Sequence, residues 1–144
     1  MSTRCPFCNI ASGKAPVSIV YKDANVMVFM DTHPASIGHT LVVPLEHWET
    51  IYDIPENILA EIFSIVKRVS IALLKAFEVE GIIVLQLNGK AAGQTVMHFH
   101  VHIIPRFRSN SISRVPRAKF EHHKHVRPKR EELDTTAKKI KENL

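Results

Sequence analysis

The segment from His98 to His102 alternates three histidines with two apolar residues. In a β-strand successive side chains point to opposite faces, so the imidazoles are predicted to share one face while Phe99 and Val101 point into the core. A single histidine on a strand is usually a structural residue. Three in alternation are costly, because crowded imidazoles lose hydration and repel one another when protonated. We therefore interpret the segment as a functional cluster that lines a cleft.

Two kinds of chemistry suit three histidines on one face. Neutral imidazole is the commonest metal ligand, so a metal site is one interpretation. The other is phosphate chemistry, because Asn88, the run Gly93-Gln94-Thr95 and His39 supply polar groups and backbone amides suited to phosphate oxygens. A nucleophile beside phosphate donors favours a phosphotransfer site.

Five short segments have the β-prone composition of strands, and polar turns or Pro- and Gly-containing loops separate them. The strands are grouped around one helix, mostly without long crossovers. This arrangement favours an α+β fold with an antiparallel five-stranded meander sheet over a parallel sheet. The predicted strands are Val17–Val20, Val26–Phe29, His39–Val43, Ile82–Leu87 and His98–Ile104.

One long amphipathic helix is predicted to cover this sheet. Asp53, Pro55 and Glu56 form a start signal, because a capping carboxylate, a proline in the first turn and an acid near the positive end of the helix dipole all favour a helix N-terminus. Apolar residues then recur at steps of three and four until Gly81 ends the pattern. A second, C-terminal helix is predicted over residues 131–144.

The length and composition indicate a single globular domain over residues 1–144. The chain has 144 residues, of which 45% are hydrophobic and 23% charged, and is too short for two independent cores. No segment approaches the roughly 20 consecutive apolar residues that span a bilayer. Residues 1–14 lack the apolar centre of a signal peptide. We expect a cytoplasmic protein without a membrane partner.

The positive charge is concentrated in one irregular segment. Residues 106–130 contain nine Lys and Arg and the single acid Glu121, within a chain whose net charge is +5. Such a segment favours phosphate-bearing ligands or nucleic acid, although a solvated basic surface is the commoner explanation. His122, His123 and His125 in this segment suggest a second metal site or a polyanion contact. A solvated surface is again our preferred interpretation, and nucleic acid is not the expected partner.

Several motifs together resemble the histidine triad (HIT) family. The matching residues are Asp31 to His47, with the run Gly38-His39-Thr40-Leu41-Val42-Val43-Pro44, followed by Asn88-Gly89 and Gly93 to Ile104. The likeness extends from Cys5 to about Arg106 and is greatest to the compact branch that hydrolyses nucleoside phosphoramidates and related nucleotides. It implies a small α+β domain that forms a homodimer and acts as a hydrolase or transferase on a nucleotide substrate.

The resemblance implies a role for each catalytic position. His100 is the nucleophile that takes the nucleoside monophosphate as a covalent phosphoramidate, which water then cleaves. His102 and His39 contact the phosphate and manage protons, and Thr95 contacts the leaving side with a hydroxyl where the family usually has serine.

The resemblance also implies a substrate-binding set around these residues. Asp31 is expected to bind the ribose hydroxyls, although it is also suited to capping a turn. Phe29 and Leu41 are candidate walls for the base, or ordinary core residues. The expected contacts to phosphate or sugar are Asn88, Gly93 and Gln94.

The pair Cys5 and Cys8 is ambiguous by itself. Two cysteines are too few for a disulfide scaffold, and the Cys-x-x-Cys spacing occurs in both redox pairs and zinc sites. The family resemblance adds His47 and His98 to the pair as a structural zinc site of the Cys2His2 type. The alternative is that both cysteines are free thiols.

Two other functions compete with nucleoside phosphoramidate hydrolysis. The first is hydrolysis of dinucleoside polyphosphates, for which the same nucleophile would serve. The second is a non-catalytic nucleotide- or zinc-binding interaction module whose basic segment docks nucleic acid or a protein. An imperfect histidine cluster would be expected of such a module, and here all three histidines from His98 to His102 are present.

Overall fold

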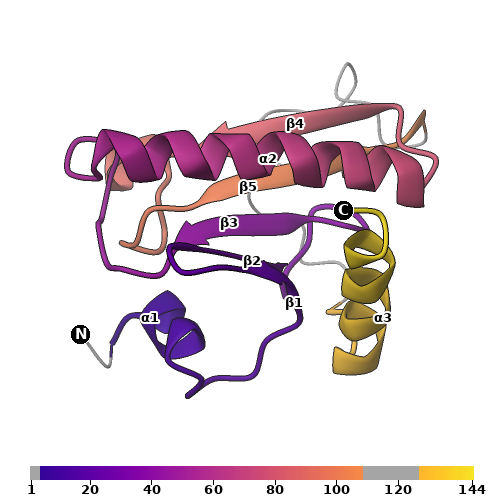
Figure 1. Ribbon diagram of the computed structural model, residues 1–144, viewed down its shortest axis with the longest axis horizontal. Helices are drawn as coiled ribbons and strands as arrows, with labels where there is room; N and C mark the ends of the chain where they lie inside the picture. Colours follow the sequence, from indigo (N-terminus) through magenta and orange to yellow (C-terminus); the bar gives the residue numbers. More distant parts are fainter. Residues whose placement is uncertain (1–3, 109–126) are drawn as a thin grey trace.

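The computed structural model describes residues 4–108 and 127–144, which form one five-stranded antiparallel sheet with helices packed on it (Figure 1). The predicted α+β class, five strands, long helix and C-terminal helix are confirmed. The order departs from a simple meander in one place, because the last strand lies between the third and the fourth. The order is β1 (Ile19–Lys22), β2 (Val26–Met30), β3 (Thr40–Pro44), β5 (Val101–Arg106) and β4 (Gly81–Gln86).

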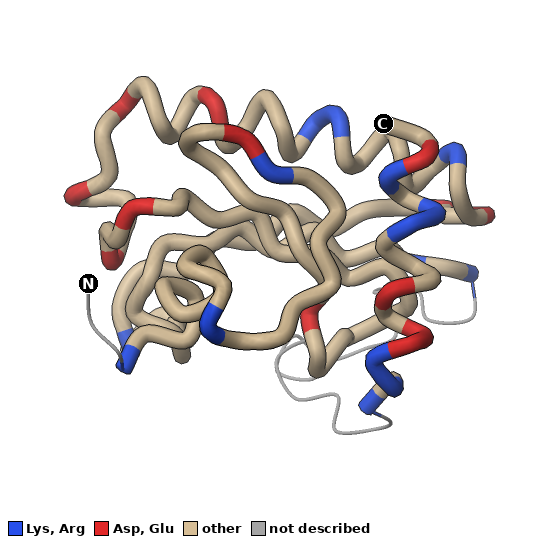
Figure 2. Tube along the Cα trace, turned by 60° about the horizontal axis from the view of Figure 1, so that its bottom comes forward, with Lys and Arg blue, Asp and Glu red and all other residues tan. Residues whose placement is uncertain are grey.

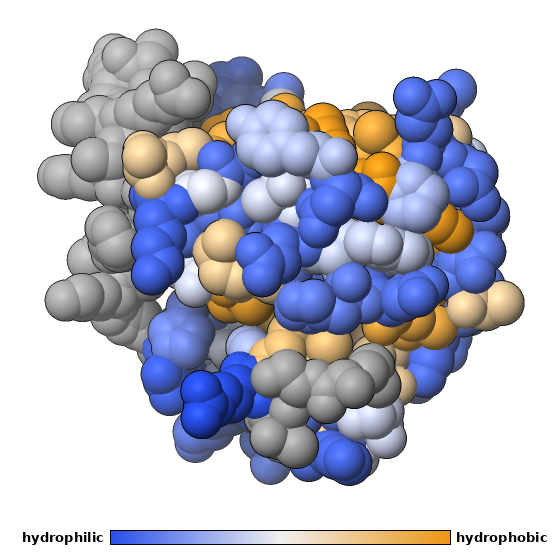
Figure 3. Space-filling view, turned by 90° about the vertical axis from the view of Figure 1, so that its left-hand side faces the viewer, coloured by the Kyte–Doolittle hydropathy of each residue, from blue (hydrophilic) through white to orange (hydrophobic). Residues whose placement is uncertain are grey.

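The helices lie on different sides of the sheet (Figure 1). The long helix α2 (Glu56–Ala76) covers one face, and α3 (Arg130–Lys141) packs against α2 and the β1 edge. The short helix α1 (Pro6–Ala11) lies on the opposite face. The end of the molecule with α1 and the first turns of α2 has a mostly hydrophilic surface with apolar residues between (Figure 3). Because α2 covers one face of the sheet, a site has room on the opposite face, which carries α1.

Helix α2 is shorter at both ends than the sequence predicts. It begins at Glu56 with Pro55 at the N-cap, while the carboxylate of Asp53 accepts hydrogen bonds from backbone N–H groups of the preceding turn. It ends at Ala76, five residues before Gly81, which begins β4. The predicted apolar stripe is buried against the sheet, and this burial holds α2 in place.

The strand that carries the histidines begins later than predicted. The strand ladder starts at Val101 instead of His98, because the backbone N–H of Phe99 donates to the carbonyl of Trp48 and not to a neighbouring strand. The alternation of faces nevertheless continues through this segment. Phe99 and Val101 join the core under α2, whereas His100 points to the α1 side. The predicted common face is thus present even though only part of the segment is a strand.

The remaining sequence predictions concern the C-terminal third and the membrane. The C-terminal helix spans Arg130–Lys141 instead of 131–144. Most of the predicted basic segment, including His122, His123 and His125, lies outside the described residues. In the parts of the chain that the structure describes, no helix is both long and apolar enough to cross a membrane.

Candidate functional site

A pocket of about 600 Å³ opens on the face of the sheet that carries α1. His39, His100 and His102 contribute to its wall, so the three histidines to which the sequence assigns chemistry are brought together. Five further predicted residues line the same pocket: Phe29, Asp31, Leu41, Gly93 and Thr95. These residues come from β2, β3, β5 and the loops beside them, which explains why the sheet order matters for the site.

His100 is held in the protonation state that a nucleophile needs. Its Nδ1 lies 2.7 Å from the carbonyl oxygen of His98, and a carbonyl can only accept, so Nδ1 carries the proton and Nε2 keeps its lone pair. Burial lowers the pKa of His100, although the hydrogen bond to His98 and the charge of Asp31 act in the opposite direction. The ring is therefore a neutral imidazole at neutral pH.

His39 and His102 form a short hydrogen-bonded chain. The backbone N–H of Ala35 donates to Nδ1 of His39 at 2.9 Å, so His39 in its neutral form carries its proton on Nε2. That Nε2 lies 3.0 Å from Nδ1 of His102, which must accept, so the proton of a neutral His102 is on Nε2. Burial, with the neighbouring charges of His100 and His39, lowers the pKa of His102 to about 3. His102 thus presents a proton donor near His100, the ring centroids being 4.9 Å apart.

The loop before β3 brings Asp31 to this chain. Gly38 has a φ of +88°, and a Cβ atom on it would lie 3.0 Å from Leu73 and 3.2 Å from Pro105, so the loop can close only with glycine there. Asp31 accepts from the backbone N–H of His33 at 2.8 Å through Oδ1, which makes it a turn cap. Its Oδ2 lies 3.4 Å from Nε2 of His39. Asp31 therefore caps a turn, as one of its two sequence interpretations predicts, and it also lines the pocket.

Asn88 and Gln94 are placed differently from the other predicted residues, because neither lines the pocket. The side chain of Asn88 exchanges hydrogen bonds with Gln86 and accepts from the backbone of Ile51 at 2.7 Å. The amide of Gln94 is buried and bonds three backbone groups, namely those of Gly89, Glu49 and Val96. Both amides therefore hold the loop that carries Gly93 and Thr95. An amide side chain is suited both to this role and to phosphate binding, so residue type alone could not decide between them.

The sequence analysis missed several pocket residues. Phe7 lies 5.5 Å from the ring of Phe29 and 5.1 Å from that of His100, and Val17 precedes β1. Leu85 and Leu87 contribute from the end of β4. Arg130 reaches the pocket from the first turn of α3. These residues carry no motif. The docking of α1 brings Phe7 to the site, the docking of α3 brings Arg130, and the sheet order brings Leu85 and Leu87.

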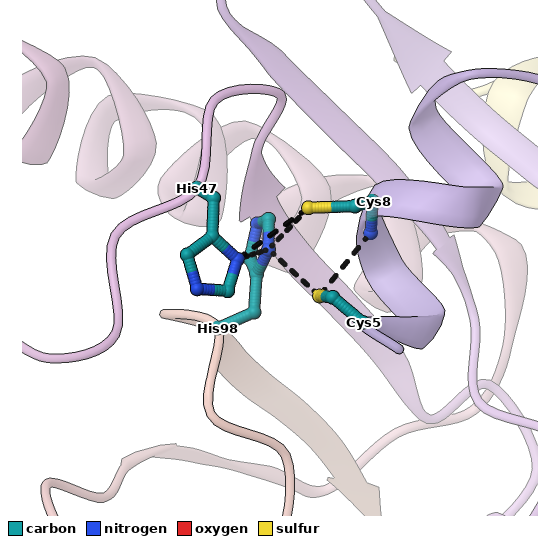
Figure 4. A group of neighbouring side chains, drawn as sticks. All are labelled: Cys5, Cys8, His47 and His98. Atoms are coloured by element: carbon teal, nitrogen blue, oxygen red, sulfur yellow. Dashed lines mark hydrogen bonds between the residues drawn. The ribbon is translucent and has the colours of Figure 1, made fainter. Parts of the chain in front are cut away.

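A second cluster lies beside the pocket, where Cys5, Cys8, His47 and His98 converge (Figure 4). Nδ1 of His98 is 3.3 Å from Sγ of Cys5, and Nδ1 of His47 is 3.4 Å from Sγ of Cys8. One ligand atom from each residue lies within 4.8 Å of all the others. The folding-back of α1 therefore joins two cysteines to two histidines that are distant in sequence.

The geometry of this cluster fits a tetrahedral metal ion. Nε2 of His98 donates to the carbonyl of Pro44 at 2.8 Å, which leaves the lone pair of Nδ1 facing the sulfurs. The backbone N–H of Cys8 points to Sγ of Cys5 at 3.4 Å, an interaction that stabilises a thiolate. Two sulfur and two nitrogen donors are the set that structural zinc sites use, and burial of three of the four residues closes the site to substrate.

The family model of the HIT domain matches residues 12–109 of this chain. The chain is 37% identical to a HIT-like protein of Methanocaldococcus jannaschii over 95% of its own length and 98% of the relative's. It is 39% identical to the adenosine 5′-monophosphoramidase of Schizosaccharomyces pombe, over 71% and 74% of the two lengths. The crystal structure of a zinc-bound histidine triad family protein from Mycobacterium smegmatis has a TM-score of 0.80 at 29% identity, covering 99% and 94% of the two chains.

Proposed function

This chain belongs to the histidine triad family, and from that premise we propose that it is a nucleotide hydrolase or transferase whose His100 attacks the α-phosphorus of a nucleoside phosphoramidate or a related substituted nucleotide. The observation that carries the proposal is the hydrogen bond from Nδ1 of His100 to the carbonyl of His98. It places the ring proton on Nδ1 and leaves the lone pair of Nε2 free, while burial keeps the ring neutral, as nucleophilic attack requires.

The proposed reaction has two displacements at phosphorus. In the first, Nε2 of His100 bonds to phosphorus and the bond to the leaving group breaks. His102, whose proton is on Nε2, stays neutral and donates a hydrogen bond to a phosphoryl oxygen, while a water molecule gives the leaving group its proton. In the second, the resulting hydroxide attacks phosphorus and the bond to His100 breaks, which restores the neutral imidazole. The products are a nucleoside monophosphate and, for a phosphoramidate, the free amine.

The supporting residues receive roles according to their placement. His39 fixes the tautomer of His102, because the backbone of Ala35 occupies its other nitrogen. The hydroxyl of Thr95 and the backbone at Gly93 line the pocket and are proposed to contact the leaving side and the phosphate. Asn88 and Gln94 are proposed to act indirectly, by holding this loop.

The nucleoside is proposed to occupy the apolar part of the pocket. Phe29 and Leu41 provide walls for the base together with Phe7, whose ring packs edge-on against that of Phe29. Asp31 is proposed to accept hydrogen bonds from the ribose hydroxyls, because its carboxylate lies at the pocket and a carboxylate can accept several hydrogen bonds at once.

Zinc is proposed as the cofactor, held by Cys5, Cys8, His47 and His98 in a structural role. The support is the donor set, the lone pair of His98 directed at the sulfurs, and the zinc-bound relative. The site would hold α1, and with it Phe7, against the sheet.

A homodimer is proposed through the edge strand β4. This strand is at the end of the sheet and has the apolar sequence Ile82-Ile83-Val84-Leu85. Within the described residues it is only partly covered, and Val84 is 46% exposed. An uncovered apolar edge with free backbone groups is suited to pairing with a second copy of itself.

The deciding experiment compares substrates. Purified protein is incubated with adenosine phosphoramidate and, separately, with diadenosine polyphosphates, and the products are separated by chromatography. We expect release of AMP from the phosphoramidate at the greater rate. A greater rate on the polyphosphates would favour the dinucleotide hydrolase, and nucleotide binding without turnover of either would favour the binding module.

A further inference from the structure

Arg130 reaches the nucleotide pocket from a helix that otherwise packs at the far edge of the sheet. It is the first residue of α3, a helix that carries acidic residues in its first turns and lysines in its last turn (Figure 2). One guanidinium nitrogen, Nη1, donates to Oγ of Ser18 at 2.8 Å. Ser18 in turn donates to Oδ1 of Asp134 at 2.6 Å. The guanidinium is thus held in place by a hydroxyl on the chain leading into β1.

The charge of Arg130 is not neutralised by this contact, because its partner is a neutral hydroxyl. The two ion pairs among residues 4–108 and 127–144 join His39 to Asp31 and Arg108 to Glu80, so neither involves Arg130. Asp134 accepts from Ser18 and forms no ion pair with Arg130 among the ion pairs of the described residues. A positioned arginine without a carboxylate partner is suited to an anion from the ligand.

Arg130 is also the only lysine or arginine among the described residues that line the pocket. Two of the pocket histidines are neutral because burial lowers the pKa of His39 and lowers that of His102 to about 3. Much of the remaining wall is apolar, with residues such as Phe7, Ile10 and Val17. A nucleotide is a multiply charged anion, so the pocket needs a cation that these other groups do not provide.

We infer that Arg130 is a substrate-binding residue that recognises an anionic phosphate or sulfate group of the nucleotide. The planar guanidinium presents paired donors that match such oxyanions. The inference rests on the proposed function and extends it to a residue beyond the 12–109 segment of the family model. The anion has three possible positions on the ligand: the 5′-phosphate itself, a further group on the leaving side, or a phosphate on the ribose.

Calorimetric binding to the full chain separates these positions. The ligands are adenosine, AMP, ADP and adenosine 3′,5′-bisphosphate, and the variants are Arg130→Ala and Arg130→Gln, the second retaining most of the side-chain volume. We expect both variants to bind at least one phosphorylated ligand about tenfold more weakly or worse, because each removes the charge-assisted hydrogen bonds between the guanidinium and the phosphate. Adenosine should change by less than about twofold. A loss of affinity for AMP would identify the 5′-phosphate. A loss only for ADP would identify a group on the leaving side, and a loss only for the bisphosphate would identify a phosphate on the ribose.

The matched control is Arg127→Ala, which removes the same charge from an exposed residue that does not line the pocket. It should leave all four affinities unchanged, and thermal melting should show that each variant is folded. Equal weakening of adenosine and the nucleotides, or nucleotide affinities unaffected by both Arg130 variants, would overturn the inference while leaving the proposed function intact. If the parent protein binds none of these nucleotides, the proposed function itself fails.

Discussion

Nδ1 of His100 lies 2.7 Å from the carbonyl oxygen of His98. The side chain of His98 points to the two cysteines, so the proposed metal ligand His98 and the proposed nucleophile His100 are only two residues apart. The backbone carbonyl of His98 fixes the tautomer of His100, and the side chain of the same residue belongs to the cluster of Cys5, Cys8, His47 and His98. This cluster does not line the pocket, so loss of the proposed metal is expected to reduce stability more than activity.

Replacement of His100 by alanine should abolish turnover and leave folding and nucleotide binding largely intact. The substitution removes the attacking nitrogen but keeps the pocket walls and the core. Activity on adenosine phosphoramidate and AMP affinity are the measurements, with Tyr52→Ala, at an exposed residue that does not line the pocket, as the control. Acid-labile labelling of the parent at His100 would give independent support. Substantial turnover by His100→Ala would refute the covalent mechanism.

Protein purified without chelator should contain about one zinc ion per chain. The double substitution Cys5→Ser and Cys8→Ser should release it and lower the melting temperature, because the metal joins α1 to the loop at His47 and to His98. Elemental analysis and thermal melting are the measurements, and Ser12→Ala at the end of α1 is the control. If the parent contains no zinc and the double variant melts like the parent, the cysteines are free thiols.

The protein should have twice its chain mass of 16.3 kDa in solution at micromolar concentration. Val84→Lys should convert it to a monomer, because a charge at the centre of the partly exposed edge strand β4 opposes burial against a second copy. Light scattering gives the mass. Tyr52→Lys, at a residue that is 84% exposed and outside the sheet, should remain dimeric. A parent mass near 16.3 kDa would contradict the proposed dimer.

The free energy of unfolding should decrease as the pH is lowered, because His102 becomes protonated. Burial lowers its pKa from the ordinary 6.5 to about 3 in the folded protein, so folding favours the neutral ring. This contribution is complete above pH 6.5 and is lost as the pH falls towards 3, by up to about 2 kcal/mol between pH 6.5 and 5. Chemical denaturation at pH 7.5 and 5.0 should show a larger loss in the parent than in His102→Gln. Equal losses in the two proteins would mean that His102 does not titrate as proposed.

Local patterns in the sequence were sufficient to predict the five strands and the helices α2 and α3, but not the short helix α1. The three-and-four spacing of apolar residues marked α2, and the β-prone runs between polar turns marked the strands to within a few residues. The alternation around His100 also indicated which side chains share a face, and this holds even where the backbone is not in a strand. Such properties depend on neighbours in the chain, so a single sequence contains them.

The tertiary structure decided the properties that depend on distant contacts. Insertion of β5 between β3 and β4 sets His102 beside His39, and the Ala35 N–H then fixes the tautomers of both rings. The amide of Gln94 is equally suited by type to a phosphate or to backbone groups, and only packing assigns it to the latter. Arg130 has no motif at all and reaches the pocket because α3 docks beside β1. Residue type and spacing thus determined which chemistry the chain can perform, whereas long-range packing determined which residues meet to perform it.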